Sequence, residues 1–266
     1  MTTHTPTAPS PATTAEDVSH EASWEVAWHG WAAERDETIT APHGVASATG
    51  THWLGAEPTE VPGLPGRWWA EDGQVRGETA DVPVRIAPGA RLALGERVLT
   101  ALAPGGALAV RVLDPAAPTR TSLTGVVRHD PDPAWVLTGR FVPAAADATL
   151  PIEHADGRTT DDPVVGTVEV EVAGSAASLV AFGRPGGLQV TFGDASNGDG
   201  PEGAGSVGFR FLSLPEPAAD GTVTVDLNRA YLPPCVFTDH YLCPLPPPQN
   251  RLPVRVAAGE RWPTYA

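Results

Sequence analysis

The sequence predicts a mainly β protein: a single antiparallel β-barrel or sandwich with one N-terminal helix and a proline-rich C-terminal strap. Two observations predict the strands. Short apolar segments with alternating polarity follow one another along the chain, and 28 glycines and 29 prolines supply turns between them. A third observation, a stripe of tryptophans at helical spacing, predicts the helix.

The chain begins with a polar segment. Residues 1–14 are mainly Thr, Pro, Ala and Ser, which bury too little apolar surface to offset the entropy of ordering. We therefore predict a disordered tail at 1–14, followed by a single all-β domain with its N-terminal helix at 15–266.

The helix is expected directly after the tail, and Pro42-His-Gly44 should end it. Its apolar positions recur at the spacing of one helical face. We interpret this face as one that packs against the core, with an aromatic ligand box as the alternative. The residues on it are Trp24, Ala27, Trp28 and Trp31.

Strands at short intervals are expected in the first half of the chain, each bounded by Gly, Pro or Asp. In one of them, Leu108, Val110 and Val112 fall on one side while Arg111 faces the other, which is typical of a half-buried antiparallel strand. The expected strands are 67–70, 74–78, 82–87, 108–113, 123–128 and 135–142.

The second half continues the pattern. Val168, Val170 and Val172 alternate with polar residues, and a long glycine-rich loop is expected at 193–205. The further strands predicted here are 179–182, 188–192, 207–212, 223–227 and a last one at 254–257.

Charge limits the possible partners. The chain has 17 Lys and Arg against 32 Asp and Glu, a formal net charge of -15. Binding to nucleic acid or to an anionic membrane depends on many cations, so neither partner is expected. No segment approaches the ~20 apolar residues of a membrane span, and the first residues lack the basic start and apolar core of a signal peptide. We predict a cytoplasmic protein.

The strap, residues 226–253, concentrates polar side chains in a proline-rich segment that can form neither a regular helix nor a central strand. It holds both cysteines of the chain, Cys235 and Cys243. Free thiols, a disulfide and metal ligands all remain open for this pair. The strap is a candidate functional site and equally a candidate structural clamp.

The strap also resembles a known family. Its residues follow the pattern D-x-N-R-A-Y-x-P-P-C, then C-P-L-P-P, N-R-L and A-G-E, from Asp226 to Glu260. This is similar to the C-terminal signature of a bacterial family named domain of unknown function 1684, with weaker similarity back to Trp53. Leu232 stands where members usually have Asn, and 206–209 lacks a tyrosine that they tend to have. The resemblance implies no particular reaction.

Strong motifs for catalysis are absent from the sequence. It has no P-loop, no H-E-x-x-H and no G-x-S-x-G, so a nucleotide cofactor is not expected. The acidic loop with Asp194, Asn197, Asp199 and Glu202 does not satisfy the EF-hand pattern, and we interpret it as a solvated turn.

The candidate site residues come mainly from the strap. Arg229 has the planar donor fork that suits a carboxylate, and Tyr231 is a candidate general acid if a cation lies beside it. Either Asp194 or His52 is predicted to complete the acid–base function with Tyr231. The predicted substrate-binding residues are Arg229, Arg210, Asn228 and Trp53.

The leading functional hypothesis is the binding or transformation of a small organic molecule in a β-barrel cavity, without a nucleotide cofactor or a metal. One alternative is a non-catalytic structural or interaction protein in which the strap is a clamp. The other is a metal-dependent enzyme that uses His52 and His240.

Overall fold

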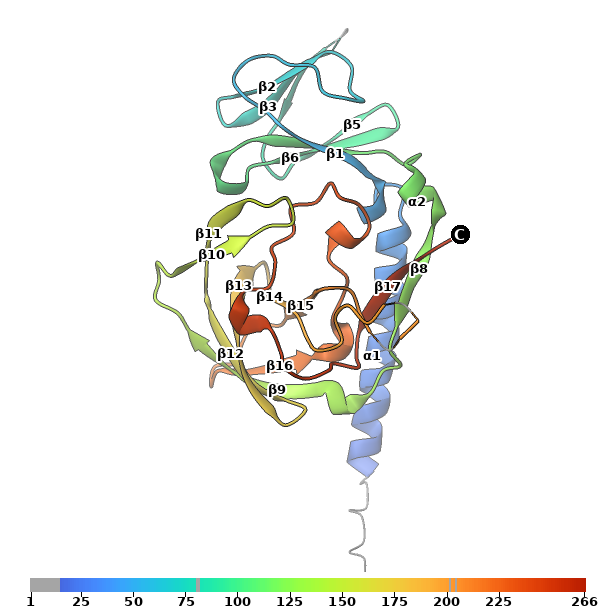
Figure 1. Ribbon diagram of the computed structural model, residues 1–266, viewed down its shortest axis with the longest axis vertical. Helices are drawn as coiled ribbons and strands as arrows, with labels where there is room; N and C mark the ends of the chain where they lie inside the picture. Colours follow the sequence, from blue (N-terminus) through green and yellow to red (C-terminus); the bar gives the residue numbers. More distant parts are fainter. Residues whose placement is uncertain (1–14, 80–81, 201, 204) are drawn as a thin grey trace, which may run out of the picture.

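The computed structural model of the chain describes residues 15–79, 82–200, 202–203 and 205–266. The tail predicted at 1–14 lies outside the described residues. The mainly β fold is confirmed, with one long N-terminal helix, α1 (Ala15–Thr40), beside the strands (Figure 1). A second helix, α2 (Pro118–Ser122), is a single short turn. No helix in the described part combines the length and apolar character needed to cross a membrane.

The largest element is a six-stranded antiparallel sheet that curls into a half-barrel, so the predicted barrel is only half formed (Figure 1). The strands in spatial order are β15 (Arg210–Leu214), β14 (Gly187–Phe192), β13 (Ser175–Arg184), β12 (Gly166–Val172), β9 (Val136–Pro143) and β16 (Thr222–Asp226).

The alternation predicted from sequence places one face of the half-barrel in the main core. Val168, Val170 and Val172 point inward, and strap residues such as Leu227 and Leu252 fill the concave side. Burying this apolar face stabilises the sheet at roughly 25 cal/mol per Å² of surface removed from water.

Two smaller sheets lie together at the top of Figure 1 and share a second core around Trp68, Ile86, Leu99 and Val110. We call them the upper sheets. The first has the order β1 (Ala48–Trp53), β7 (Ala109–Leu113), β6 (Arg97–Leu102) and β5 (Arg91–Leu94). The second comprises β2 (Arg67–Glu71), β3 (Gln74–Glu78) and β4 (Pro83–Ile86).

Two strand pairs complete the fold. The hairpin of β10 (Thr149–Glu153) and β11 (Thr159–Pro163) lies beside the half-barrel, and β8 (Leu123–Arg128) pairs with the last strand, β17 (Glu260–Tyr265). The short 3-10 helices of the structure are η1 (Val45–Ser47), η2 (Pro104–Gly106), η3 (Pro133–Trp135), η4 (Leu227–Arg229), η5 (Pro234–Val236) and η6 (Pro248–Asn250).

Helix α1 packs its tryptophans against the C-terminal part of the chain. The indole of Trp24 donates to Asp226 at 3.0 Å, and that of Trp28 to the backbone oxygen of Asn228 at 3.1 Å. Ala27, predicted on the same face, is exposed. The contact face continues instead through Trp31 and Arg35 to Ile39, and Ile39 packs in a cluster with Leu232 and Phe237 of the strap.

A buried carboxylate fixes the far half of α1. Glu260 is fully buried and accepts from Arg35 at 3.1 Å, from Arg128 at 3.0 Å and from the Leu232 N–H at 2.8 Å. Because a buried charge needs partners for its lone pairs, these three donors account for its position.

The strand predicted at 254–257 is wrong, since the last strand of the structure is Glu260–Tyr265. The backbone at Val254 and Val256 bonds to the loop at Asp194 and to the Arg210 side chain in place of a neighbouring strand. Strands β1, β5, β6, β10, β11 and β17 are additional to those predicted.

Candidate functional site

The strap crosses between the upper sheets, the β10–β11 hairpin and the half-barrel. Thr51 on β1 donates its hydroxyl to the backbone oxygen of His240 at 2.6 Å. After the hairpin strand β10, the N–H of Ala155 donates to the backbone oxygen of Cys243 at 2.9 Å. The strap therefore lies in the junction where these three parts meet.

Asn250 fixes the end of the strap to the half-barrel. Its side chain is fully buried, accepts from the Val180 N–H at 2.7 Å, and donates to the backbone oxygens of Val180 and Thr191 at 2.9 and 2.8 Å. Every polar atom of the amide is thus used within the fold, and Asn250 is a structural residue.

Arg111 on β7 faces the strap from the upper sheets. Its Nε donates to the Thr51 hydroxyl at 3.0 Å, and its guanidinium carbon lies 4.1 Å from the ring centroid of Tyr241. Burial lowers the pKa of Arg111, although arginine stays charged in proteins. Across the described ranges of the chain, no carboxylate forms an ion pair with it.

Arg111 and Tyr241 form one wall of a hollow of about 410 Å³, which we call the strap pocket. The rest of the wall is mostly apolar, and this volume is in the range of small-molecule sites. The strap contributes Leu242, Cys243 and Pro244 to it, while the other elements contribute Leu102, Pro104 and Phe211.

Both cysteines are free thiols in contact with each other. The Cys235 N–H donates to Sγ of Cys243 at 3.2 Å. The hydrogen bond between the two thiols lowers the pKa of Cys235, whereas this bond and burial raise the pKa of Cys243. Cys243, which lines the strap pocket, is therefore protonated at neutral pH and is no thiolate nucleophile there.

Arg229 and Tyr231, predicted to act together, have different partners in the structure. Arg229 has its Nε 3.3 Å from a carboxylate oxygen of Asp226. The hydroxyl of Tyr231 donates to Gln189 at 3.1 Å, and the cation beside its ring is Arg35, 4.9 Å from the centroid.

Asp194 and Arg210 are brought together. Both side chains are fully buried and pair at 2.7 Å, and Arg210 also donates to the backbone oxygens of Val256 and Ala258. Substrate binding by Arg210 stays a prediction that this burial does not support, because the guanidinium is occupied and closed off from solvent. Asn197, from the same loop, accepts from the Asp194 N–H.

The remaining predicted residues lie at separate places. Asn228 is buried and bonds both backbone groups of Asp132 at 3.0 Å. Trp53 is stacked under the Arg158 guanidinium, 3.5 Å from a ring centroid. Burial and the nearby His240 lower the pKa of His52.

None of the four residues predicted to be catalytic lines the strap pocket; they are Arg229, Tyr231, Asp194 and His52. Within the described residues, no three His, Cys, Asp or Glu side chains gather in a group able to hold a metal ion. The geometry therefore gives no support to the metal-dependent alternative built on His52 and His240.

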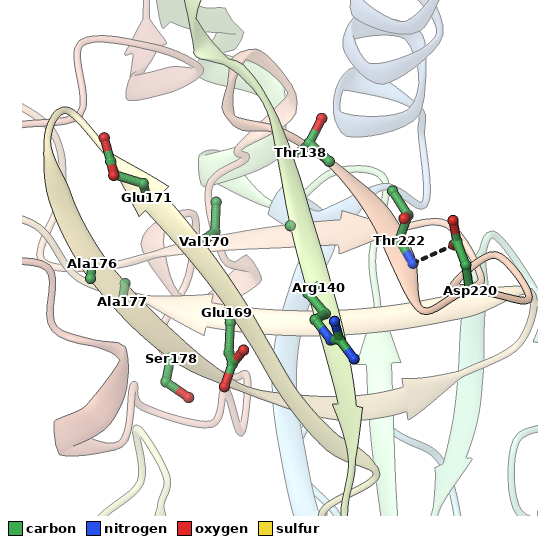
Figure 2. Close-up of a pocket in the computed structure, with 11 residues that line it drawn as sticks. Thr138, Arg140, Glu169, Val170, Glu171, Ala176, Ala177, Ser178, Asp220 and Thr222 are labelled. Carbon is green, nitrogen blue, oxygen red and sulfur yellow. Dashed lines mark hydrogen bonds between the residues drawn. The ribbon is translucent and has the colours of Figure 1, made fainter.

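A larger hollow, of about 680 Å³, lies on the outer face of the half-barrel. Figure 2 shows its residues, with Arg140 on β9 and Glu169 on the neighbouring β12, and the hydrogen bond from the Thr222 N–H to Asp220. Arg140 and Glu169 are exposed and lie opposite each other in the strand pairing. Their charges are mixed and solvated, so this groove offers a ligand less than the strap pocket does.

Sequence reasoning missed Arg111 and Tyr241. The available signal was the alternation in 108–113, which sets Arg111 on the face opposite the buried valines. The tyrosine lies ten residues beyond Tyr231 in the same strap, but nothing in the sequence indicates which of the two meets an arginine.

Comparison with known proteins identifies a family and a similar solved structure. The family described as "Protein of unknown function (DUF1684)" matches residues 121–261. A solution NMR structure of an uncharacterized protein from Haloarcula marismortui is 31% identical, covering 52% of this chain and 76% of that chain, with a TM-score of 0.41. Comparison with curated proteins gives no match. The chain belongs to the DUF1684 family.

Proposed function

We propose that this protein binds a small organic anion in the strap pocket, with Arg111 pairing the charged group and the apolar wall holding the rest of the molecule. The observation that carries the proposal is the partly buried guanidinium of Arg111, which forms no ion pair in the described part of the chain. A cation that loses water on burial without a counterion is costly, and a bound anion would supply that counterion.

The overall negative charge of the protein strengthens the case for Arg111 as an anion-binding residue. With a net charge of -15, the protein repels anions at long range, so anion binding needs local cations in a sheltered site. From sequence, this role is predicted for Arg229. We propose Arg111 in its place because Arg229 already has Asp226 as its counterion.

The proposal is for binding without a covalent step. Burial raises the pKa of Tyr241, and the contact with Cys235 together with burial raises the pKa of Cys243, so both stay protonated at neutral pH. In that form they are neutral hydrogen-bond donors at the pocket wall and not nucleophiles.

The test is isothermal titration calorimetry with aromatic carboxylates, sulfonates and phosphates at constant ionic strength. We expect at least one of them to bind, and Arg111→Met to weaken that binding by roughly tenfold or more, since a charge-assisted pair is lost. The matched control is Arg85→Met, an exposed arginine on β4.

Two outcomes would contradict this function. One is that no anion of the panel binds the wild-type protein. The other is that Arg111→Met, with an unchanged circular dichroism spectrum, binds as tightly as the wild type. Either result would favour the structural alternative, in which Arg111 serves only to tie β1 to Tyr241 of the strap.

A further inference from the structure

A row of polar side chains crosses the first upper sheet. In the strand pairing, Arg91 on β5 lies opposite Thr100 on β6, Thr100 lies opposite Arg111 on β7, and Arg111 lies opposite Thr51 on β1. Residues directly opposite each other project from the same face of a sheet. Neighbouring strands are about 4.8 Å apart, so the backbones at Arg91 and Arg111 are separated by about 10 Å.

Three members of this row, Arg91, Thr100 and Arg111, line a second hollow of about 600 Å³, which we call the head pocket. Arg111 and Tyr241 line both the head pocket and the strap pocket, so the two hollows adjoin at this pair. Arg91 and Thr100 line the head pocket but not the strap pocket. The end of α1 closes its other side, where Glu37 is the one acidic residue of the lining.

Apart from the bond of Arg111 Nε to Thr51, no hydrogen bond to protein occupies the donors of Arg91, Thr100, Arg111 and Tyr241 within the described residues. Within the residues that the structure describes, neither Arg91 nor Arg111 pairs with a carboxylate, and the hydroxyls of Thr100 and Tyr241 make no hydrogen bond. Two guanidinium groups and two hydroxyls therefore converge on one hollow with hydrogen-bonding capacity to spare.

We propose that the anion bound at Arg111 is a phosphomonoester, with its phosphate in the head pocket between Arg91 and Arg111 and its apolar part in the strap pocket. This inference rests on the proposed function and names the ligand class for the same site. A phosphate ester carries close to two negative charges at neutral pH and three terminal oxygens, which match two guanidinium groups and the hydroxyl of Thr100.

A carboxylate would use this site less completely. One guanidinium fork satisfies both oxygens of a carboxylate, so Arg111 alone would suffice, and Arg91 and Thr100 would have no role in recognition. A second arginine on the opposite side of the row is useful only to a group with more charge and more acceptors. Arg91 also adds a second positive charge to a lining that contains the carboxylate of Glu37.

The experiment compares phenyl phosphate with benzoate by isothermal titration calorimetry at constant ionic strength. In the wild type we expect phenyl phosphate to bind roughly tenfold more tightly. Arg91→Gln should remove about tenfold of the phenyl phosphate affinity and leave benzoate binding unchanged, because only the phosphate reaches Arg91. Arg85→Gln, the control on β4, should change neither.

The outcomes separate the two proposals. If benzoate binds as tightly as phenyl phosphate and Arg91→Gln changes neither, while Arg111→Met weakens both, the phosphate assignment is overturned and the anion site stands. If neither ligand binds, the phosphate assignment is overturned, and the anion site is overturned with it when no other anion of the panel binds. Inorganic phosphate that binds as tightly as phenyl phosphate would contradict the part given to the strap pocket.

Phosphomonoesters occur both as small molecules and as lipid headgroups, so a last arm separates the two sources. Vesicles of phosphatidylcholine containing phosphatidic acid are sedimented with the protein. We expect no co-sedimentation, since hollows of about 410 and 600 Å³ suit a small molecule. Co-sedimentation that Arg91→Gln abolishes, without phenyl phosphate binding, would overturn the small-molecule assignment.

Discussion

His129 is a half-buried histidine with a hydrogen-bonding atom left unused. Its Nε2 has no partner within the described residues. Burial is the largest cause that lowers the pKa of His129 to about 4, and the positive charges of Arg261 and Arg210 add to it, while Asp194 and Asp130 act in the opposite direction. The folded protein therefore holds this imidazole neutral over a range of pH in which a free histidine is charged.

This histidine should make stability depend on pH. In the unfolded chain it titrates near 6.5, so the unfolded state takes up the proton first, and the free energy of unfolding should fall as pH drops from 6.5 towards about 4. We expect urea denaturation to show a shallower decline for His129→Gln over this range. His29→Gln, at an exposed position of α1, is the control. A decline as steep in His129→Gln as in the wild type would contradict the prediction.

At the scale of elements, Asn250 decides how the strap meets the half-barrel. Asn250→Ala would leave the Val180 N–H and the backbone oxygens of Val180 and Thr191 without this partner inside the core. Each unsatisfied buried group costs about 1–3 kcal/mol, so we expect a loss of about 3 kcal/mol or more in the free energy of unfolding. Equilibrium urea denaturation measures it, with the exposed neighbour Gln249→Ala as control. A loss no larger than that of the control would be inconsistent with the clamp.

The strands that sequence predicted are those whose alternation is regular. Val168 to Val172 is one such segment, and the structure has strand β12 there, paired with β13 and β9. Strand β17 was missed because Pro263 interrupts its pattern and because it pairs only with β8, with register shifts on the way. The false strand at 254–257 has the right apolar residues, but its backbone bonds to Asp194 and Arg210, which lie far away in sequence.

The candidate site was less predictable than the strands because it also depends on contacts between residues far apart in sequence. Arg111 and Tyr241 are 130 positions apart by their numbers, and their contact depends on how the strap crosses the upper sheets. Periodicity reports which face of a strand a residue occupies, but not which distant segment covers that face. The sequence also could not show that Arg229 has its own carboxylate in Asp226.

For the whole molecule, the prediction of one domain over 15–266 leads to a calorimetric test. The half-barrel and the upper sheets have separate cores, but the strap bonds to both, to the upper sheets at His240 in its middle and to the half-barrel at Asn250 near its end. We expect one thermal transition in differential scanning calorimetry, with equal calorimetric and van't Hoff enthalpies. Two transitions would show that the upper sheets unfold alone. Thr51→Val, which removes one strap contact, should lower the transition temperature without splitting it.

The attachment of α1 to residues 226–260 has a consequence for protein synthesis. The helix leaves the ribosome well before its partners, because the groups that bind Trp24, Trp28 and Arg35 lie between Asp226 and Glu260, at least 200 residues later in the chain. Until then, its tryptophans have no native partner among these residues, and contacts this distant in sequence form slowly. The docking of α1 is therefore completed only after residues 226–260 have been synthesised, and a product truncated before residue 226 would carry an uncovered aromatic stripe that chaperones or proteases can recognise.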